Sequence, residues 1–582
     1  MKKIIYLSIL IIASMSCNTK KETADSAADN SFSEFENVFL DNYWKQYPAA
    51  SIANGYGKYY DQLVIPGSNT VAANIAFSHK WLDSLNTLDH GHLSDNNKIS
   101  FNIIKNQLES DNWYASVFKQ YEWDASMYNL GGECYYIINQ PYAPLDERLR
   151  ILSRHLQHAD DYYTAAFKIL QQPTKEHVSL SILQNKGSLS VFETGLPDSI
   201  KASHLTDAEK NDLNQNISKT VAAIKTFVDS LNSIVANKDY VFRDFRIGKK
   251  LFTEKFKYDL VTDLTPEEIY SKAVADKKFY YDRMYQNAGK LWTKYFSSQA
   301  KPKDTLEIIR SVIDRISLQH ATPEALFDTL TSQVYQLKRF IIAKDLFDFD
   351  TSYPMKVRLM PEYARGFAAA SAEFTPPYQK QGDTYYNIDD LTKYSKEKAE
   401  GELRETNDYA SWFLSIHEAM PGHCLQGIYN NKKSPDVVRS VFQNGAMIEG
   451  WAVYTETMMM ENGFGNHSPE LELMHDKLKL RELANVIIDY DIQCLNKPEE
   501  AIMHLLVKEC FQTKAQAEEK YHRATVSQVQ LCSYYTGATA IQSLRDEYKK
   551  KMGSNYSLKV FHEVFLSFGS SPVKYIRERM LE

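Results

Sequence analysis

The stretch FLSIHEAMPGHCLQ, residues 413–426, holds two histidines and a glutamate in an arrangement close to the metal-binding motif H-E-x-x-H. In that motif one face of a helix carries both imidazoles, because positions four residues apart differ by only about 40° of rotation. His417 and His423 are six residues apart. On a regular helix this offset is about 240° of rotation and about 9 Å of rise. Two such side chains could not share one ion on an unbroken helix.

Pro421 and Gly422 lie between the two histidines. Proline removes a backbone donor and clashes with the preceding turn, whereas glycine permits unusual backbone dihedral angles. We therefore predict that the helix is interrupted at this pair and that its phase is reset, so that the two imidazoles converge.

A third ligand is needed, because zinc sites in hydrolases usually combine three His or Glu ligands with one open position for water. The segment NGAMIEGWAVYTE, residues 444–456, offers Glu449 among apolar neighbours. A carboxylate in such surroundings is costly to bury without a partner, and a dication is the strongest partner available. The alternative is that Glu449 points outward on an amphipathic helix, with Glu456 on the same face. Glu418, beside His417, would reach a water molecule at the ion and act as the general base.

The segments HEAMPGHCLQ and EGWAVYTE resemble the two signatures of the bacterial family known as domain of unknown function 885, regarded as relatives of zinc-dependent peptidases. Three further segments extend the resemblance over about residues 240–582: TYYN (384–387), SYYTG (533–537) and FHEVFLSFGSSPV (561–573). The N-terminal half is similar in helical character only. The resemblance implies a mainly α, multi-helical, cleft-bearing fold similar to thermolysin-like (zincin) oligopeptidases. It also implies Zn²⁺ as the cofactor, with His417, His423 and Glu449 as its ligands and Glu418 as the base.

The chain departs from the family pattern at two places. Where the family commonly has D-T-G-x-H, this chain has DYDIQ at residues 489–493, with Gln493 at the position of the histidine. The proline-glycine pair ahead of SYYTG is replaced by Gln528 and Val529. If the family histidine contacts substrate or transition state, activity or specificity differs in this chain.

Four residues outside the metal motif are candidates for contact with a substrate. The phenol of Tyr534, in SYYTG, would donate to the oxyanion of a tetrahedral intermediate, a packed ring being the alternative. The resemblance also implies that Tyr385 and Tyr386 line an edge strand on which an extended peptide could lie. Arg523 would bind a substrate carboxylate through its planar fork, or else form a structural ion pair. For His562 we expect a role in helix packing.

The first 17 residues, MKKIIYLSILIIASMSC, have two lysines and an apolar run too short to span a bilayer, which is typical of a secretory signal. Their end resembles a bacterial lipoprotein signal, although Ser14 replaces the usual leucine. We expect the chain to be exported and anchored to a bacterial membrane by a lipid on Cys17. The expected membrane is the outer membrane, with the protein facing the periplasm or the cell surface. The alternative is a plain signal peptide with a coincidental cysteine. Residues 18–31 are polar and suit a flexible tether.

Composition excludes several classes of protein. With 582 residues, 43% of them hydrophobic, the chain is typical of a folded protein with a large core. Its net charge of -7 gives no reason to expect a nucleic-acid partner. The five cysteines after Cys17 are never spaced C-x-x-C, so they indicate neither a disulfide framework nor a cysteine zinc site. Buried free thiols are expected, and one bridge remains open in an oxidising compartment.

Most of the chain has the apolar spacing of helices, as in residues 145–170 and 264–292. In the second segment, Thr265 before Pro266 and two glutamates form a helix-start signature. Clustered prolines at 353–390 break the pattern, and we predict a small β insert around residues 355–390. A soft boundary near residue 250 separates an N-terminal helical region, 32–250, from a catalytic helical region, 251–582; a single helical body divided by a cleft is equally compatible.

These observations predict a zinc-dependent peptidase that uses a metal-activated water, with Glu418 as general base and no covalent intermediate. A second interpretation is a zinc hydrolase of another amide, such as a cell-wall peptide or a modified amino acid, because zinc polarises any carbonyl. A third is a non-catalytic, peptide-binding lipoprotein of the cell surface on the same scaffold, which would have no need of Glu418.

Overall fold

The computed structural model describes residues 27–348, 355–361, 369–379, 382–434 and 436–582. The predicted signal peptide, Cys17 and residues 18–26 of the predicted tether lie outside the described residues. The described chain begins in a helix, residues 27–46, which includes the last part of the predicted tether. None of the described helices is both long enough and apolar enough to cross a bilayer.

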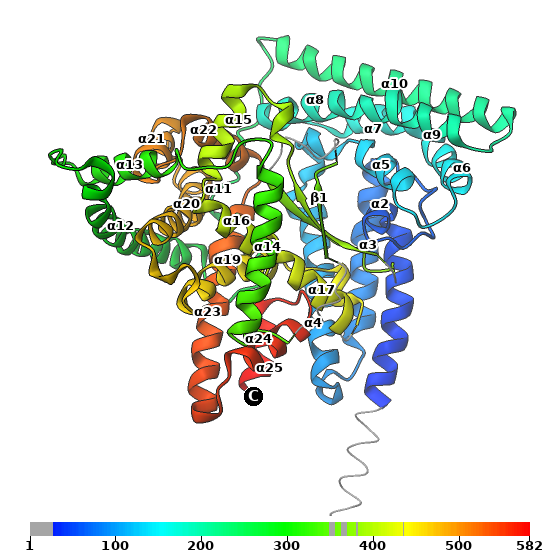
Figure 1. The fold of residues 1–582 in the computed structure, drawn as a ribbon. Helices are drawn as coiled ribbons and strands as arrows, with labels where there is room; N and C mark the ends of the chain where they lie inside the picture. The colour runs from blue at the N-terminus through cyan, green and yellow to red at the C-terminus, as the bar shows by residue number, and fades with distance from the viewer. Residues whose placement is uncertain (1–26, 349–354, 362–368, 380–381, 435) are drawn as a thin grey trace, which may run out of the picture. The chain divides into compact units, whose positions relative to one another are not determined.

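The chain divides into two compact units between residues 244 and 245. The boundary expected from the sequence was near residue 250. The first unit is helical (blue to cyan in Figure 1). Beyond the helix at 27–46, its main helices are α2 (Pro48–Ala53), α3 (Ser68–Asn86), α4 (Asp95–Trp113), α5 (Gly131–Asn139), α6 (Leu145–His155), α7 (Ala159–Ile169), α8 (Lys175–Ser190), α9 (Leu196–Ala202) and α10 (Asp207–Ala236). The long helix α10 packs against α6, α7 and α8, and buried Leu152, Tyr163 and Phe227 belong to one shared core.

The second unit, residues 245–582, carries every candidate site residue. Its helices are α11 (Gly248–Leu260), α12 (Pro266–Phe296), α13 (Thr305–Ile316), α14 (Leu326–Ala343), α15 (Lys396–Glu405), α16 (Ala410–Glu418), α17 (His423–Lys433), α18 (Val438–Val441), α19 (Gly445–Glu461), α20 (Pro469–Gln493), α21 (Glu499–His504), α22 (Lys514–Val526), α23 (Ser533–Met552), α24 (Leu558–Ser567) and α25 (Val573–Leu581). Helix α12 begins with the predicted signature: Thr265 caps it and forms a capping box with Glu268. The expectation of a mainly α fold is confirmed.

Two helix pairs form the frame of this unit: α12 packs along α20, and α19 packs along α23. The second pair approaches very closely, because a Cβ on Gly450 of α19 would lie 2.5 Å from the Cα of Gly537 of α23. Residues with side chains could not occupy this crossing without separating the helices. The segments EGW and SYYTG, distant in sequence, are therefore held backbone to backbone.

The predicted β insert is a three-stranded sheet in the order β1-β3-β2. Strand β1 (Met355–Leu359) is parallel to β3 (Thr384–Ile388), with Met355 opposite Thr384, and β2 (Ala370–Glu373) is antiparallel to β3, with Ala372 opposite Tyr386. One face of the sheet joins a core that includes Leu330 of α14 and Ala419. The sheet thereby lies against the segment that carries the metal motif, with β2 in contact with α16 and α17.

Candidate metal centre

The interruption between α16 and α17 re-aims the second histidine. Helix α16 ends one residue after His417, and α17 begins at His423 with Gly422 as its N-cap. The N–H of Gly422 donates to the carbonyl of Ile416 at 2.9 Å. A Cβ at position 422 would lie 1.9 Å from the carbonyl oxygen of His417, so only glycine fits this close approach. The predicted break at Pro421 and Gly422 is confirmed.

The break brings His417, His423 and Glu449 together, so that the three side chains could hold one metal ion. The two imidazole rings are 4.8 Å apart between centroids and nearly perpendicular, at 89°. The Oε2 atom of Glu449 lies 3.7 Å from Nε2 of His417 and 3.6 Å from Nε2 of His423. Two ligand atoms about 2.1 Å from one ion at the tetrahedral angle are about 3.4 Å apart. These separations therefore fit a shared ion.

The charges around the three side chains also suit a cation. Burial alone would lower the pKa of His417, but the carboxylates of Glu449 and Glu456 outweigh it and hold that pKa well above its usual value. Burial alone would raise the pKa of Glu449, but its hydrogen bonds with His417 and His423 outweigh it and hold that pKa below its usual range. The potential that retains a proton on His417 is negative, and the same potential attracts a metal ion.

Glu456, two turns after Glu449 on α19, supports His417 from behind. Its Oε1 atom accepts a hydrogen bond from Nδ1 of His417 at 2.8 Å, which leaves Nε2 directed toward Glu449. A histidine that ligates a metal typically donates its second ring N–H to such a carboxylate. Only 4% of Glu456 is exposed, so it does not mark an outward face of the helix, which was the alternative for Glu449.

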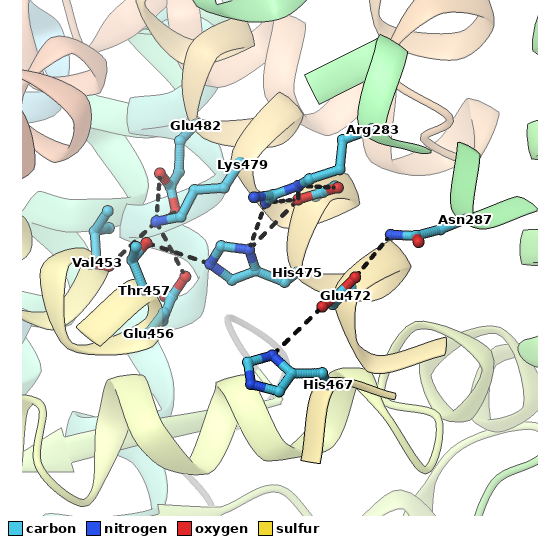
Figure 2. Close-up of polar contacts among 11 residues, drawn as sticks. Arg283, Asn287, Val453, Glu456, Thr457, His467, Glu472, His475, Lys479 and Glu482 are labelled. Carbon is cyan, nitrogen blue, oxygen red and sulfur yellow. Dashed lines mark hydrogen bonds and ion pairs between the residues drawn. The ribbon is translucent and has the colours of Figure 1, made fainter. Parts of the chain in front are cut away.

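A buried network of charges continues from Glu456 into α20. Figure 2 shows Lys479 with Glu456, Glu482 and the Val453 carbonyl around its ammonium group, at 3.6, 3.2 and 3.1 Å. Burial alone would lower the pKa of Lys479, but the two carboxylates outweigh it and raise that pKa. Burial raises the pKa of Glu482 to about 8. Lys479, Glu482 and the role of Glu456 were not predicted from the sequence. For Glu456 a signal was available: Glu449 and Glu456 are seven residues apart, on the same face of the largely apolar helix α19.

Glu418 connects the motif to the sheet. One of its carboxylate oxygens accepts a hydrogen bond from the backbone N–H of Ala372 in β2, at 3.1 Å. The N–H of Asp389 donates to the carbonyl of Ala369, so the N–H groups of residues 370 and 372 point away from β3, toward the free edge of β2. The candidate base therefore lies beside β2, the outermost strand on that side of the described sheet.

The edge-strand prediction for Tyr385 and Tyr386 is wrong. Their strand, β3, is the central strand of the described sheet, and β2 is the edge strand near Glu418. Tyr386 is fully buried, with its hydroxyl 3.4 Å from Oγ of Ser415, so its ring is part of the core. Tyr385 lies on the opposite face, where the guanidinium of Arg358 stacks 3.7 Å from its ring centroid. Alternation of exposure along the TYYN segment could not reveal which strand of the sheet was outermost.

A model of the family described as bacterial protein of unknown function (DUF885) matches residues 48–580. The chain belongs to the DUF885 family. A solved structure from Shewanella oneidensis, described as a "putative lipoprotein of unknown function", is 40% identical with a TM-score of 0.87, and the match covers 95% of this chain and 100% of that chain. A "putative lipoprotein" from Colwellia psychrerythraea shares the fold at 14% identity, with a TM-score of 0.77 and coverage of 95% and 98%. None of the curated proteins matches this chain.

In this DUF885 protein, Tyr534 and Arg523 lie together. Arg523 donates to the hydroxyl of Tyr534 at 3.3 Å and to Oε1 of Gln530 at 2.8 Å. Tyr534 lies in the first turn of α23, one turn before Gly537, which contacts Gly450 next to Glu449. The helix crossing thus places the first turns of α23 beside the part of α19 that carries Glu449.

Two further residues of the DUF885 motifs have structural contacts. Gln493, at the position of the family histidine, is fully buried; it accepts from the N–H of Ile247 at 3.0 Å and donates to the carbonyl of Ala524 at 3.1 Å. His562 is also fully buried, hydrogen bonds with the hydroxyl of Tyr454 at 2.9 Å, and has a pKa lowered to about 3 by burial. Both residues join helices, as expected for His562.

A cavity of about 460 Å³ in the second unit lies apart from the metal motif. It is lined by residues of α14, α16 and the turn before α20, among them Phe340, Trp412 and Phe464. Trp412 is in the first turn of α16, whereas His417 is in its last. The cavity therefore opens at the other end of this helix and is not the site of the three candidate ligands.

Proposed function

We propose that this DUF885 protein is a zinc-dependent peptidase. The observation that carries the proposal is the convergence of His417, His423 and Glu449, whose ligand atoms all lie within 4.8 Å of one another, with Glu418 directly beside the first histidine. Three such ligands and an adjacent carboxylate are the requirements for metal-assisted hydrolysis.

His417, His423 and Glu449 would hold the Zn²⁺ ion, which would supply Lewis-acid polarisation of a carbonyl and of water. Glu456 holds the imidazole of His417 in one orientation through its Nδ1–H. The carboxylate of Glu418 removes the proton of the attacking water and passes it to the leaving amine. The phenol of Tyr534 donates a hydrogen bond to the oxygen of the tetrahedral intermediate.

The free edge of β2 provides a place for an extended peptide. The backbone groups of residues 370 and 372 face away from β3, and the N–H of Ala372 contacts Glu418. A substrate strand would add to this edge through main-chain hydrogen bonds, with its scissile bond carried toward Glu418. β2 takes the role that the sequence had suggested for the strand of Tyr385 and Tyr386.

We also propose that the protein is exported and anchored by a lipid on Cys17. The support is the signal pattern that ends at this cysteine and the description of the relatives from Shewanella oneidensis and Colwellia psychrerythraea as lipoproteins. A peptidase held in this way would act on peptides outside the cytoplasm.

The test combines metal analysis with peptide digestion by the purified full-length protein. We expect bound zinc and cleavage of a defined peptide mixture, read by mass spectrometry. His417→Ala should lose both metal and cleavage, whereas Glu418→Gln should keep the metal and lose turnover. His467→Ala is the matched control, because the ring of His467 is exposed and pairs with Glu472, away from the three candidate ligands. Equal zinc content in wild type and His417→Ala would refute the ligand set. Zinc-free protein that binds peptides without cleaving them would favour a binding lipoprotein.

A further inference from the structure

The indole of Trp451, on α19, reaches the break between α16 and α17. Its Nε1–H donates a hydrogen bond to the carbonyl of Pro421 at 2.9 Å, and both residues are buried. Pro421 precedes the N-cap Gly422, so its carbonyl lies outside the hydrogen-bond ladder of α17. Among the residues that the structure describes, no backbone N–H donates to this carbonyl. The indole therefore supplies a hydrogen bond that the local backbone does not make.

The ring of Trp451 is itself held in place by α24. The ring of Phe565 stacks on it, with centroids 5.6 Å apart and planes inclined by 15°, and the imidazole of His562 lies perpendicular to it at 5.6 Å. His562 is fixed in turn by hydrogen bonds with the hydroxyl of Tyr454 at 2.9 Å and the carbonyl of Leu346 at 3.2 Å. Rings packed on two sides restrict the rotation of the indole, so its N–H keeps one direction.

Trp451 joins the segments that carry two of the candidate ligands. It lies two residues after Glu449 on α19, and Pro421 lies two residues before His423, the first residue of α17. The hydrogen bond between residues 451 and 421 therefore ties the helix that bears the carboxylate to the turn that directs the second imidazole. Oε2 of Glu449 and Nε2 of His423 are 3.6 Å apart, close to the separation of about 3.4 Å that a tetrahedral site requires. Small movements of this turn would take the pair out of that range.

We propose that Trp451 is a positioning residue of the metal centre, which fixes the break so that His423 faces Glu449. It acts through the carbonyl of Pro421 and not on the metal ion directly. Without the indole N–H this carbonyl would be buried without a partner, which is unfavourable, and the turn would move to relieve it. The identity of the site as a zinc centre rests on the proposed function, but the dependence of metal binding on Trp451 can be measured without turnover.

The experiment removes the indole donor and keeps an aromatic ring. Trp451→Phe does this, and benzothienylalanine introduced at position 451 keeps the shape of the double ring and replaces the N–H by sulfur. Zinc affinity of the full-length protein is measured by competition with a chromophoric chelator, and the visible spectrum of the Co²⁺-loaded protein reports the geometry of the ligands. Both variants should lose zinc affinity by at least about tenfold, the lower end of the loss caused by removing an outer partner of a ligand. Both should also change the Co²⁺ spectrum.

Trp292→Phe is the matched control. Trp292 is also buried, and its Nε1–H donates to the carbonyl of Gln299 at 2.9 Å, but its helix, α12, carries none of the three candidate ligands. Trp451→Phe and Trp292→Phe each lose one hydrogen bond from an indole to a carbonyl, so both should lower the melting temperature. Only Trp451→Phe should lower zinc affinity and change the Co²⁺ spectrum, because a purely structural role would affect the melting temperature alone.

Each outcome decides the proposal. Wild-type zinc affinity and an unchanged Co²⁺ spectrum in Trp451→Phe would overturn it, as would equal losses of zinc affinity in Trp451→Phe and Trp292→Phe. If Trp451→Phe does not fold, the benzothienylalanine variant decides by the same two measurements, because it fills the same space as the indole. Wild type that binds no zinc would overturn the proposed function together with this role. Wild type that binds zinc no more tightly than the variants at position 451 would overturn this role alone.

Discussion

Replacing Glu456 by glutamine should weaken zinc binding while leaving all three candidate ligands in place. Glu456 accepts from Nδ1 of His417 at 2.8 Å and thereby turns Nε2 toward Glu449. Glutamine keeps the shape of the side chain but removes the charge, and a hydrogen bond to a neutral acceptor is weaker than one to a carboxylate. Loss of such an outer partner typically lowers metal affinity by about 10- to 100-fold. This range corresponds to about 1.4 to 2.7 kcal/mol of binding free energy.

The surroundings of Glu456 place the expected loss toward the upper end of that range. Only 4% of this residue is exposed, so its charge acts through surroundings that screen it weakly. The fold should tolerate the change, because Lys479 keeps Glu482 at 3.2 Å and the Val453 carbonyl at 3.1 Å. A loss of affinity is therefore expected with the protein still folded.

The assay is a competition titration of Zn²⁺ between the full-length protein and a chromophoric chelator. Glu482→Gln is the matched control: Glu482 contacts the same lysine but none of the three candidate ligands, and burial raises its pKa to about 8. Because Glu482 does not hold the imidazole of His417, affinity should stay within about threefold of wild type. Wild-type zinc affinity in Glu456→Gln would refute the reasoning. An equal loss in both variants would show that the charge of the network matters, not the contact with His417.

Three further predictions concern stability, each measured on the full-length protein. Gly450→Ala should lower the free energy of unfolding by about 1–3 kcal/mol, because its Cβ would lie 2.5 Å from the Cα of Gly537. Gly401→Ala is the control and should not lower it, because no atom lies within 4 Å of a Cβ at that position. Equal melting temperatures for the two variants would contradict the tight helix crossing. Burial raises the pKa of Asp489 to about 7 from a usual 3.8. Between these two pH values the carboxyl group is protonated in the folded protein and ionised in the unfolded chain, so the free energy of unfolding falls as the pH rises from 3.8 to about 7. Asp489→Asn should therefore gain stability relative to wild type between pH 4 and pH 7 in urea unfolding, and a constant difference would count against this. Added zinc at about 100 times its Kd should stabilise wild type by about 2.7 kcal/mol and leave His423→Ala unchanged; equal shifts in melting temperature would argue against the site.

Local signals in the sequence predicted most of the secondary structure. Thr265 and Glu268 form the expected cap at the start of α12, and the proline-rich segment at 353–390 contains the expected strands. Residues 145–170 were expected to be helical throughout, and they form α6 and α7 with a 3-10 turn at Leu156–His158 between them. The apolar spacing continues through that turn, so it could not locate the break.

The order of the strands in the sheet could not be predicted from the sequence. The TYYN segment was expected at an edge, but β3 is bonded on both sides, to β1 and to β2. A strand's own pattern of side chains reports which face is buried, whereas its position in the sheet depends on which other strands pair with it.

The sequence by itself determined the break between His417 and His423, because a proline followed by glycine interrupts a helix through contacts within a few residues. It also singled out Glu449 as a carboxylate in apolar surroundings. Only the tertiary structure decided that Glu449 faces both imidazoles and that Glu456 lies behind His417. These relations join helices far apart in the sequence. The electrostatic role of a charged side chain depends on the groups that packing places opposite it, and helical periodicity shows only the direction in which it points.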